Sequence, residues 1–160
     1  MRTLHVLALS AFAAAHVVSA ADSPLPNIIR VSGHLFYNET GTFDKRDVFD
    51  PEFTLWNTGI GEGDAVGPSD AVLLVVELGR DPPTPWYPGF ITVKVSSEKA
   101  VLLEQRVEIA TFFSEKPTVS VPFLVQAVPC GTLTVVASVA LKTEPPPVLK
   151  TTKLLFACGE

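Results

Sequence analysis

Short runs in which apolar and polar residues alternate recur along most of this chain. In residues 91–96, for example, Ile91, Val93 and Val95 alternate with polar side chains. Successive side chains of a β-strand point to opposite faces, so a period of two indicates strands with one buried face. Clusters of Gly, Pro, Asp and Ser separate the runs, and helical periodicity is nearly absent. The pattern therefore predicts an all-β protein.

The runs predict about eight strands. We expect them at residues 28–37, 53–57, 72–78, 91–96, 101–109, 119–125, 132–141 and 150–157. Residues 72–78 are apolar on both faces, which predicts a central strand covered on each side. Pro122 cannot donate a hydrogen bond to a neighbouring strand, so its strand is expected at an edge or at a bulge. Uneven strand lengths and this edge favour two packed antiparallel sheets over a closed barrel.

The alternation also groups residues that we expect to share a core-facing row. In the first run these are Ile29, Val31, Gly33, Leu35 and Tyr37. In the run at residues 101–109 they are Val101, Leu103, Val107 and Ile109. A turn at residues 96–99 is expected to join that run to residues 91–96 as a hairpin.

Residues 1–20 have the pattern of a secretory signal peptide. Arg2 precedes an apolar run, and small residues at Ser19 and Ala20 suit a signal peptidase. The apolar run is shorter than the roughly 20 residues that cross a bilayer, which disfavours a membrane anchor. We expect cleavage after Ala20 or Ala21. Residues 21–160 then form a single β-sandwich domain that is secreted or lies in the lumen of the secretory pathway.

Cys130 and Cys158 are the two cysteines of the chain. In an oxidising compartment a disulfide between them is the expected state. The runs at residues 132–141 and 150–157 would pair as an antiparallel hairpin. If that hairpin is centred on Glu144, paired residue numbers sum to 288, and Cys130 faces Cys158. Zinc is disfavoured, because two thiols and one histidine after residue 20 fall short of four ligands.

The formal net charge is −5, from 17 acidic and 12 basic residues. Binding to nucleic acid relies on clustered Lys and Arg, and the sequence has no such cluster. No stretch after residue 20 is long and apolar enough to span a membrane. We therefore expect no nucleic-acid partner, no membrane insertion and no cofactor.

Histidine-dependent catalysis would rely on His34, the one imidazole after residue 20, whereas a glycosidase would need a pair of carboxylates that nothing in the sequence marks out. A hydrolase with a Ser-His-Asp or Cys-His arrangement would have to use His34. His34 shares a strand face with Arg30 and Ser32, which favours a surface position, and the sequence has no nucleophile elbow or metalloprotease motif. A hydrolase is therefore the least favoured alternative.

Acidic residues on both sides of residues 53–57 offer carboxylate oxygens, the ligands that calcium prefers. The candidate ligands of a calcium-dependent binding domain are Asp44, Asp47, Asp50, Glu52, Glu62 and Asp64. Their spacing does not match the calcium loop of an EF-hand. A solvated loop whose charges keep it away from sheet edges is therefore favoured over a metal site.

Residues 79–89 place Trp86 and Tyr87 in a proline-rich loop. Exposed aromatic rings on a stiff loop stack on sugars or anchor partner proteins, so a carbohydrate-binding module is one alternative. Tryptophan is on average highly buried, which favours instead a ring that covers the core. Asn38 opens the sequon Asn-Glu-Thr after the first run and is expected to carry a glycan if the source is a eukaryote.

Residues 53–61, 119–125 and 131–137 have strand and turn patterns similar to those of immunoglobulin-like adhesion modules of the CARDB and fibronectin type III kind. The Cys-Trp-Cys arrangement of antibody domains is missing, because Cys130 and Cys158 are expected on consecutive strands. The resemblance implies an immunoglobulin-like antiparallel β-sandwich of about eight strands. It also implies an interaction module but identifies no ligand, and we expect a non-enzymatic module that binds a protein or a cell-surface polymer such as an extracellular glycan.

Overall fold

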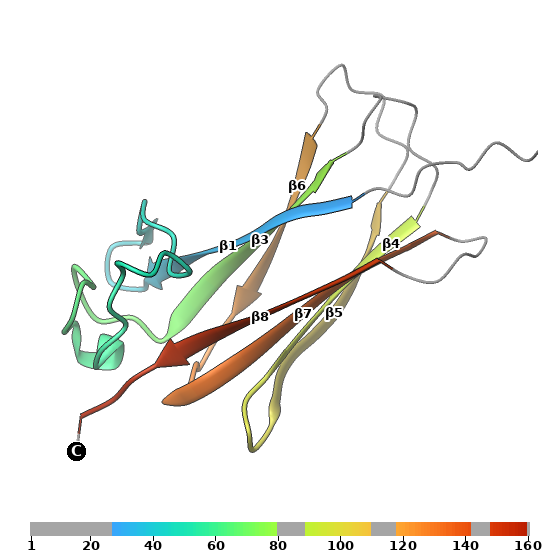
Figure 1. Cartoon of the computed structure of the whole chain (residues 1–160). Helices are drawn as coiled ribbons and strands as arrows, with labels where there is room; N and C mark the ends of the chain where they lie inside the picture. The colour runs from blue at the N-terminus through green and yellow to red at the C-terminus, as the bar shows by residue number, and fades with distance from the viewer. Residues whose placement is uncertain (1–26, 80–88, 110–117, 142–147, 160) are drawn as a thin grey trace, which may run out of the picture.

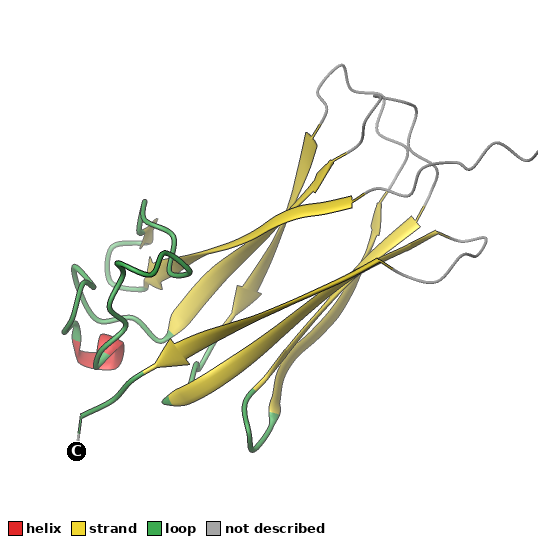
Figure 2. Cartoon of the chain, in the orientation of Figure 1, coloured by secondary structure: helices red, strands yellow, loops and turns green. Residues whose placement is uncertain are grey.

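The structure is a computed structural model that describes residues 27–79, 89–109, 118–141 and 148–159, the side chains of residues 141 and 148 excepted. These residues form eight β-strands and one turn of 3-10 helix (Figures 1 and 2). The strands are β1 (Asn27–Tyr37), β2 (Thr42–Phe43), β3 (Ala71–Gly79), β4 (Gly89–Ser96), β5 (Val101–Ile109), β6 (Thr118–Val125), β7 (Gly131–Leu141) and β8 (Val148–Phe156), and the helical turn is η1 (Thr58–Ile60).

The strands form two antiparallel sheets that pack face to face (Figure 1). The first sheet has the strand order β2-β1-β3-β6, and the second has the order β5-β4-β7-β8. The chain changes sheet after β3, after β5 and after β6. β1 contacts β8 along one side of the sandwich, and β5 contacts β6 along the other. This arrangement confirms the expected immunoglobulin-like antiparallel β-sandwich.

The hydrophobic core lies between the two sheets and is built from the period-two rows of the strands. Burying one such Val, Leu or Phe side chain contributes roughly 1.5–3 kcal/mol, so the rows hold the sheets together. Residues of the core with almost no exposed surface are Leu35, Leu74, Val76, Leu78, Ile91, Val93, Val95, Phe123, Val135 and Val139.

Seven of the eight expected strands are present in the described part of the chain, with ends that differ by at most two residues. The expected strand at residues 53–57 is wrong: they form a loop with one isolated parallel bridge, between Trp56 and Ala157. Leu55 is nevertheless buried and Trp56 is 43% exposed, so the alternation of the sequence survives without a ladder. β6 lies at an edge of the first sheet, as Pro122 predicted.

Two β-bulges move residues off their expected rows. In β1, Ile29 has no partner in β3, so Ile28 is buried and Ile29 is 49% exposed. In β5, Val101 lies opposite Ser96 and is exposed, whereas Leu102 is left unpaired and packs against the core. One extra residue shifts the alternation of a strand by one position, which a strict period of two does not predict.

The expected disulfide between Cys130 and Cys158 is confirmed, with Cα atoms 5.7 Å apart. The expected register is wrong by one residue, because Leu133 pairs with Leu154 and paired numbers sum to 287 instead of 288. Both cysteines lie just beyond the last ladder pair of β7 and β8, where the chain absorbs this offset. The true register buries Leu154 and leaves Leu155 61% exposed.

The expected signal peptide, residues 1–20, lies outside the described residues. Across the part of the chain that is described, no helix has the length and apolar character to cross a bilayer.

Candidate functional site

The outer face of β3 is apolar at Leu73 and Val75 but open to solvent, and Glu77 continues the same outward row. Leu73 and Val75 lie directly opposite Leu124 and Pro122 of β6, and both residues of β3 are only partly buried. Leu124 is 39% exposed, and Pro122 is exposed as well. The expectation that β3 is covered on each side is therefore wrong: β3 is central among the strands of its sheet, but only its inner face lies in the core.

Two phenylalanines extend this apolar surface at one end of the first sheet. Phe36 of β1 pairs with Phe43 of β2, and their ring centroids lie 4.8 Å apart with the planes tilted by 42°. Phe43 is about half exposed. We call the residues of this surface the apolar face: Phe36, Phe43, Leu73, Val75, Pro122 and Leu124.

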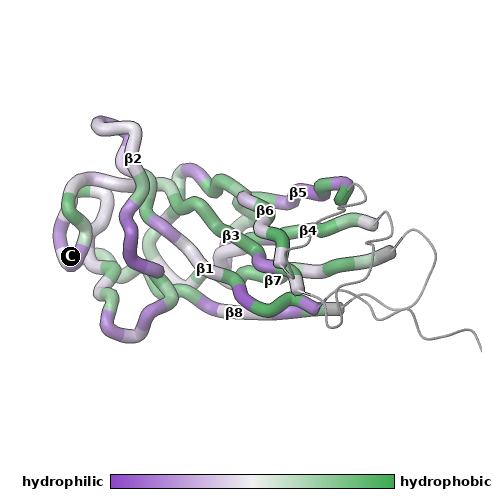
Figure 3. Tube along the Cα trace, turned by 90° about the horizontal axis from the view of Figure 1, so that it is seen from above, coloured by the Kyte–Doolittle hydropathy of each residue, from purple (hydrophilic) through white to green (hydrophobic). Residues whose placement is uncertain are grey.

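The outer face of the second sheet has a different chemistry. Lys94 of β4 forms an ion pair with Glu104 of β5 at 3.2 Å. The guanidinium of Arg106 lies 3.6 Å from the ring centroid of Phe90. Along the chain, β3 is hydrophobic over most of its length, whereas the middle of β8, residues 150–153, is hydrophilic between hydrophobic ends (Figure 3).

The edge strands differ in the same way. β5 carries Glu104, Arg106 and Glu108, and β8 carries Lys150 and Lys153. Charged residues on an edge strand oppose indiscriminate pairing and leave the edge open mainly to a chain of complementary charge. β6 carries no charged residue, and Pro122 is its one interruption, because proline removes a backbone donor. The uncharged edge therefore borders the apolar face.

A buried polar cluster fixes the segment that follows β1. The phenol of Tyr37 donates a hydrogen bond of 2.6 Å to the Asp44 carboxylate and accepts one of 3.1 Å from the Val66 backbone. The Arg46 guanidinium donates to both oxygens of Asp44, at 3.1 and 2.9 Å. The Arg46 bonds hold the pKa of Asp44 well below its usual range, helped by Tyr37 and opposed by burial. Burial, followed by the bond to Asp44, raises the pKa of Tyr37.

Arg46 links this cluster to two further parts of the segment. Its guanidinium donates to the backbone carbonyl of Asp64 and lies 3.7 Å from the Asp64 carboxylate. It also lies 4.5 Å from the ring centroid of Phe53. Because one planar cation contacts three separate places, it holds the loop between β2 and β3 against the end of the sandwich.

The calcium candidates serve local structure. Asp47 accepts hydrogen bonds from Arg30 and from the backbone of Gly33 and Phe49. Burial raises the pKa of Asp47, but these bonds together lower it below its usual range. Three further candidate carboxylates also have protein partners: Asp50 accepts from the Glu52 backbone, Glu62 from Asn57, and Asp64 from the Thr54 backbone. Among the described residues, no three acidic, histidine or cysteine side chains form a group that suits a metal ion.

His34 lies on the outer face of β1 and anchors the turn that follows β2. Its Nδ1 lies 3.1 Å from the carbonyl oxygen of Asp44 and 2.9 Å from that of Arg46. A carbonyl oxygen only accepts, so Nδ1 carries the proton and donates. In register, His34 pairs with Leu73, so its neighbour across the sheet is apolar. These contacts give the ring a positioning role for the turn.

Asn38 is exposed in the turn between β1 and β2. Its amide nitrogen donates a hydrogen bond of 3.1 Å to the Asp70 carboxylate. The hydroxyl of Thr40, the third residue of the sequon, lies 2.7 Å from that of Thr42. The sequon is thus at the surface, and its glycosylation stays a prediction.

Trp86 and Tyr87, the candidate sugar-binding residues, lie outside the described residues. Trp56, in the loop before η1, is one of the aromatic residues that the structure does place at the surface. The backbone N–H of Asn57 donates to the carbonyl of Ala157, and the N–H of Ala157 donates to the carbonyl of Leu55, both at 2.9 Å. The loop at Trp56 is therefore held against the residues that follow β8.

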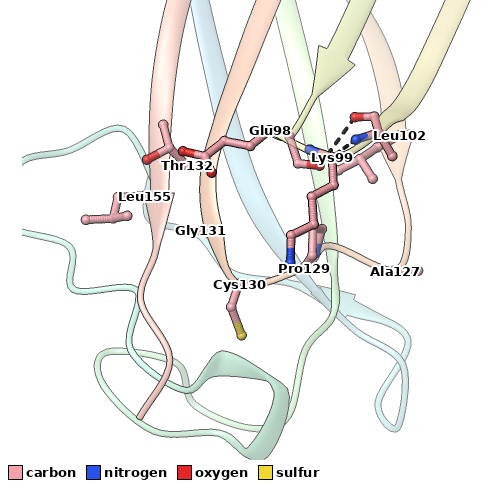
Figure 4. Close-up of a pocket in the computed structure, with 11 residues that line it drawn as sticks. Glu98, Lys99, Leu102, Ala127, Pro129, Cys130, Gly131, Thr132 and Leu155 are labelled. Carbon is pink, nitrogen blue, oxygen red and sulfur yellow. Dashed lines mark hydrogen bonds between the residues drawn. The ribbon is translucent and has the colours of Figure 1, made fainter. Parts of the chain in front are cut away.

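Two hollows flank the exposed side chain of Leu155. One, shown in Figure 4, has a volume of about 410 Å³ and lies between the β4–β5 turn and the connection from β6 to β7. The Glu98 side chain extends toward Thr132, and that of Lys99 extends toward Pro129. The other, of about 330 Å³, lies between residues 48–55 and the C-terminal half of β8.

Two features of the sequence point to the buried polar cluster. Tyr37 lies on an inward row, and a buried phenol requires a hydrogen-bond partner, which the nearby Asp44 supplies. Asp44 and Arg46 are two residues apart with opposite charges. An apolar outer row on β3 is compatible with a covered strand or with a binding face, and sequence periodicity does not separate the two.

No family model matches the chain, and no curated protein matches it in sequence. The chemistry of the molecular surface is therefore what indicates a function.

Proposed function

We propose that the protein is a secreted, non-enzymatic interaction module that binds a partner protein through the apolar face of its first sheet. The observation that carries the proposal is the row formed by Leu73, Val75, Pro122 and Leu124, which the two neighbouring strands present side by side. A contiguous exposed apolar surface on a folded protein is typical of a binding site. The charged outer face of the second sheet lacks this character.

The chemistry of the apolar face favours a protein partner over a polysaccharide. Sugar rings stack on flat, exposed aromatic rings, whereas Phe36 and Phe43 are tilted by 42° and pack on each other. Aliphatic residues supply most of the remaining surface. The uncharged edge of β6 beside this face allows a partner to approach without desolvating a charge.

Secretion is supported by the disulfide between Cys130 and Cys158. Disulfides persist in oxidising compartments and are rare in the reducing cytosol. The signal-peptide pattern of residues 1–20 agrees with this location.

A pair of leucine substitutions tests the apolar face. Leu124 of β6 and Leu149 of β8 are both exposed leucines on edge strands, but they belong to different sheets. Wild type, Leu124→Lys and Leu149→Lys are immobilised and exposed to the extracellular fluid of the source organism. Captured proteins are identified by cross-linking and mass spectrometry.

We expect Leu124→Lys to reduce capture of the specific partner by about tenfold or more, since a charge at the centre of an apolar contact must be desolvated. Leu149→Lys should capture as much as the wild type, and all three proteins should have the same thermal unfolding midpoint. Equal capture by both variants, or cross-links confined to the second sheet, would refute the proposal.

A further inference from the structure

The free edge of β8 is already used by the protein itself at one residue. Ala157 directs its N–H and its C=O to Leu55 and Asn57, which form the short parallel bridge at Trp56. The backbone groups of alternate residues point to the same side of a strand. The N–H and C=O groups of Leu155 and Lys153 therefore point to the same edge as those of Ala157.

Those backbone groups face a space and not another strand. In the described part of the chain, β8 pairs with β7 alone. Before Leu55 the loop turns away, since Phe53 donates to Asp50 and Thr54 donates to Asp64. The hollow of about 330 Å³ opens at this point, with the edge of β8 as one wall and residues 48–55 as the other.

The walls of this hollow define a peptide-like occupant. The lining side chains are mainly apolar, and they include Val48, Phe49, Pro51, Phe53 and Leu154. Lys153 is exposed and forms no ion pair with any described residue, while the carboxylate of Asp50 is engaged by the Glu52 backbone. An occupant needs backbone groups that pair with β8, an apolar side chain for the hollow, and a negative charge near Lys153.

We propose that the β8 edge between Lys153 and Ala157 binds an extended acidic and apolar segment of a partner protein by strand addition. The segment continues the ladder that the Trp56–Ala157 bridge begins, with main-chain hydrogen bonds for affinity and the hollow for selection of a side chain. At the other end of β8, Lys150 donates to the carbonyl of Ile29 at 2.6 Å and joins β8 to β1. The proposed peptide-binding edge therefore lies in the C-terminal half of β8.

This surface is separate from the apolar face, because β8 belongs to the second sheet. Each of the two proposals can consequently be tested without the other. Leu124→Lys should leave peptide binding at β8 unchanged, whatever its effect on capture of a protein partner.

The probe for the experiment is an acetylated and amidated octapeptide that alternates valine with threonine and carries two glutamates. Two matched peptides accompany it: one with lysines in place of the glutamates, and one with N-methyl groups on alternate backbone amides along one edge. Each is titrated into the ¹⁵N-labelled full domain, and binding is followed by shifts of backbone amide signals. Variants Lys153→Glu and Lys99→Glu are titrated in parallel.

We expect saturable shifts at Lys153, Leu155 and residues 48–55, with dissociation constants below about 1 mM. The N-methylated peptide should lose binding, since it cannot pair along the edge. Lys153→Glu should weaken binding of the glutamate peptide by about threefold to tenfold and strengthen binding of the lysine peptide. Lys99→Glu, in the neighbouring hollow, should change the affinity for neither peptide.

Three results would overturn the inference. They are the absence of saturable shifts at β8, equal binding of the N-methylated peptide, and shifts confined to the apolar face. Lys153 is exposed at the surface, so Lys153→Glu is expected to stay folded, and its spectrum checks this directly.

Discussion

The phenol oxygen of Tyr37 lies 2.6 Å from a carboxylate oxygen of Asp44, and both residues are buried at one end of the sandwich. Tyr37 is the last residue of β1 and lies on its core-facing row. Asp44 follows β2 and also binds Arg46. The contact therefore joins the hydrophobic core to the loop between β2 and β3, a loop with little regular secondary structure of its own.

Replacing Tyr37 by phenylalanine should destabilise the domain by about 1–2 kcal/mol, because Asp44 loses a donor and the Val66 N–H loses its acceptor. Urea unfolding followed by circular dichroism measures this difference. Thr42→Ala is the control: it removes an exposed hydroxyl–hydroxyl bond and should change stability by less than about 0.5 kcal/mol. Equal losses of stability in the two variants would show that the buried cluster contributes no more to stability than an exposed hydrogen bond.

The lowered pKa of Asp44 predicts a pH dependence with a definite sign. The folded protein keeps this carboxylate charged because Arg46 and Tyr37 donate to it. The unfolded chain protonates it near its usual pKa of about 3.9. Its contribution to stability is therefore fully present above that pH and is lost as the pH falls toward the lower folded value.

The free energy of unfolding should accordingly fall more steeply below about pH 4 in the wild type than in Asp44→Asn. The stability difference between the two proteins should be largest near neutral pH and should shrink on acidification. Asp47 also has a lowered pKa and contributes a parallel slope, which is present in both proteins and cancels in their difference. A constant difference from pH 7 to pH 2 would contradict the assignment.

The strand pattern could be read from the sequence because each core-facing row repeats every second residue. The predicted core-facing rows are wrong where one extra residue is inserted into a strand. The bulge at Ile29 and the unpaired Leu102 both shift the alternation, and no single-strand pattern contains that information. For residues 53–57 the alternation is real, yet Leu55 lies in a loop and reaches the core without belonging to a strand. Packing, and not the ladder, produced the pattern there.

The candidate sites were less predictable than the fold. The clustering of acidic residues makes Asp44 and Asp47 candidate calcium ligands, but in the fold each forms an ion pair, with Arg46 and Arg30 respectively. Arg30 lies 17 residues from Asp47, a distance that local spacing does not reveal. The apolar face joins residues of β1, β2, β3 and β6, so it exists only once the strand order is known.

Two glycines with similar backbone angles allow the cost of backbone strain to be compared with the cost of a steric clash. Gly41 and Gly63 have φ values of 66° and 72°, a region that residues with a side chain rarely adopt. A Cβ at Gly41 would meet nothing within 4 Å, whereas one at Gly63 would lie 2.6 Å from the carbonyl oxygen of Thr54. Both substitutions carry the backbone cost, but one adds a clash with the main chain.

We therefore expect Gly41→Ala to destabilise the domain by about 1 kcal/mol, and Gly63→Ala to destabilise it by several kcal/mol. Urea midpoints of the two variants, at unchanged slope, give the comparison. If both variants lose the same free energy of unfolding, the loop around Thr54 can move to accommodate a Cβ, and the close packing at Gly63 does not hold the loop.

The disulfide between Cys130 and Cys158 allows a test of how the end of β8 is held. The two residues are 28 positions apart, and closing a loop of this length stabilises a protein by about 3.5 kcal/mol in the chain-entropy model. A second anchor is present, because the Asn57 side chain accepts a hydrogen bond from the Gly159 backbone and the bridge at Trp56 binds Ala157. These bonds do not depend on the sulfurs.

The double variant Cys130→Ser/Cys158→Ser should thus remain folded but unfold at a clearly lower temperature, with the β-sheet spectrum intact. Reduction of the wild type should lower the midpoint by a similar amount, which separates loss of the crosslink from effects of the serines. In hydrogen exchange, the amide of Ala157 should keep more protection in the double variant than in the double variant that also carries Asn57→Ala. Equal protection in the two would show that the sulfur bridge alone holds this end of the chain.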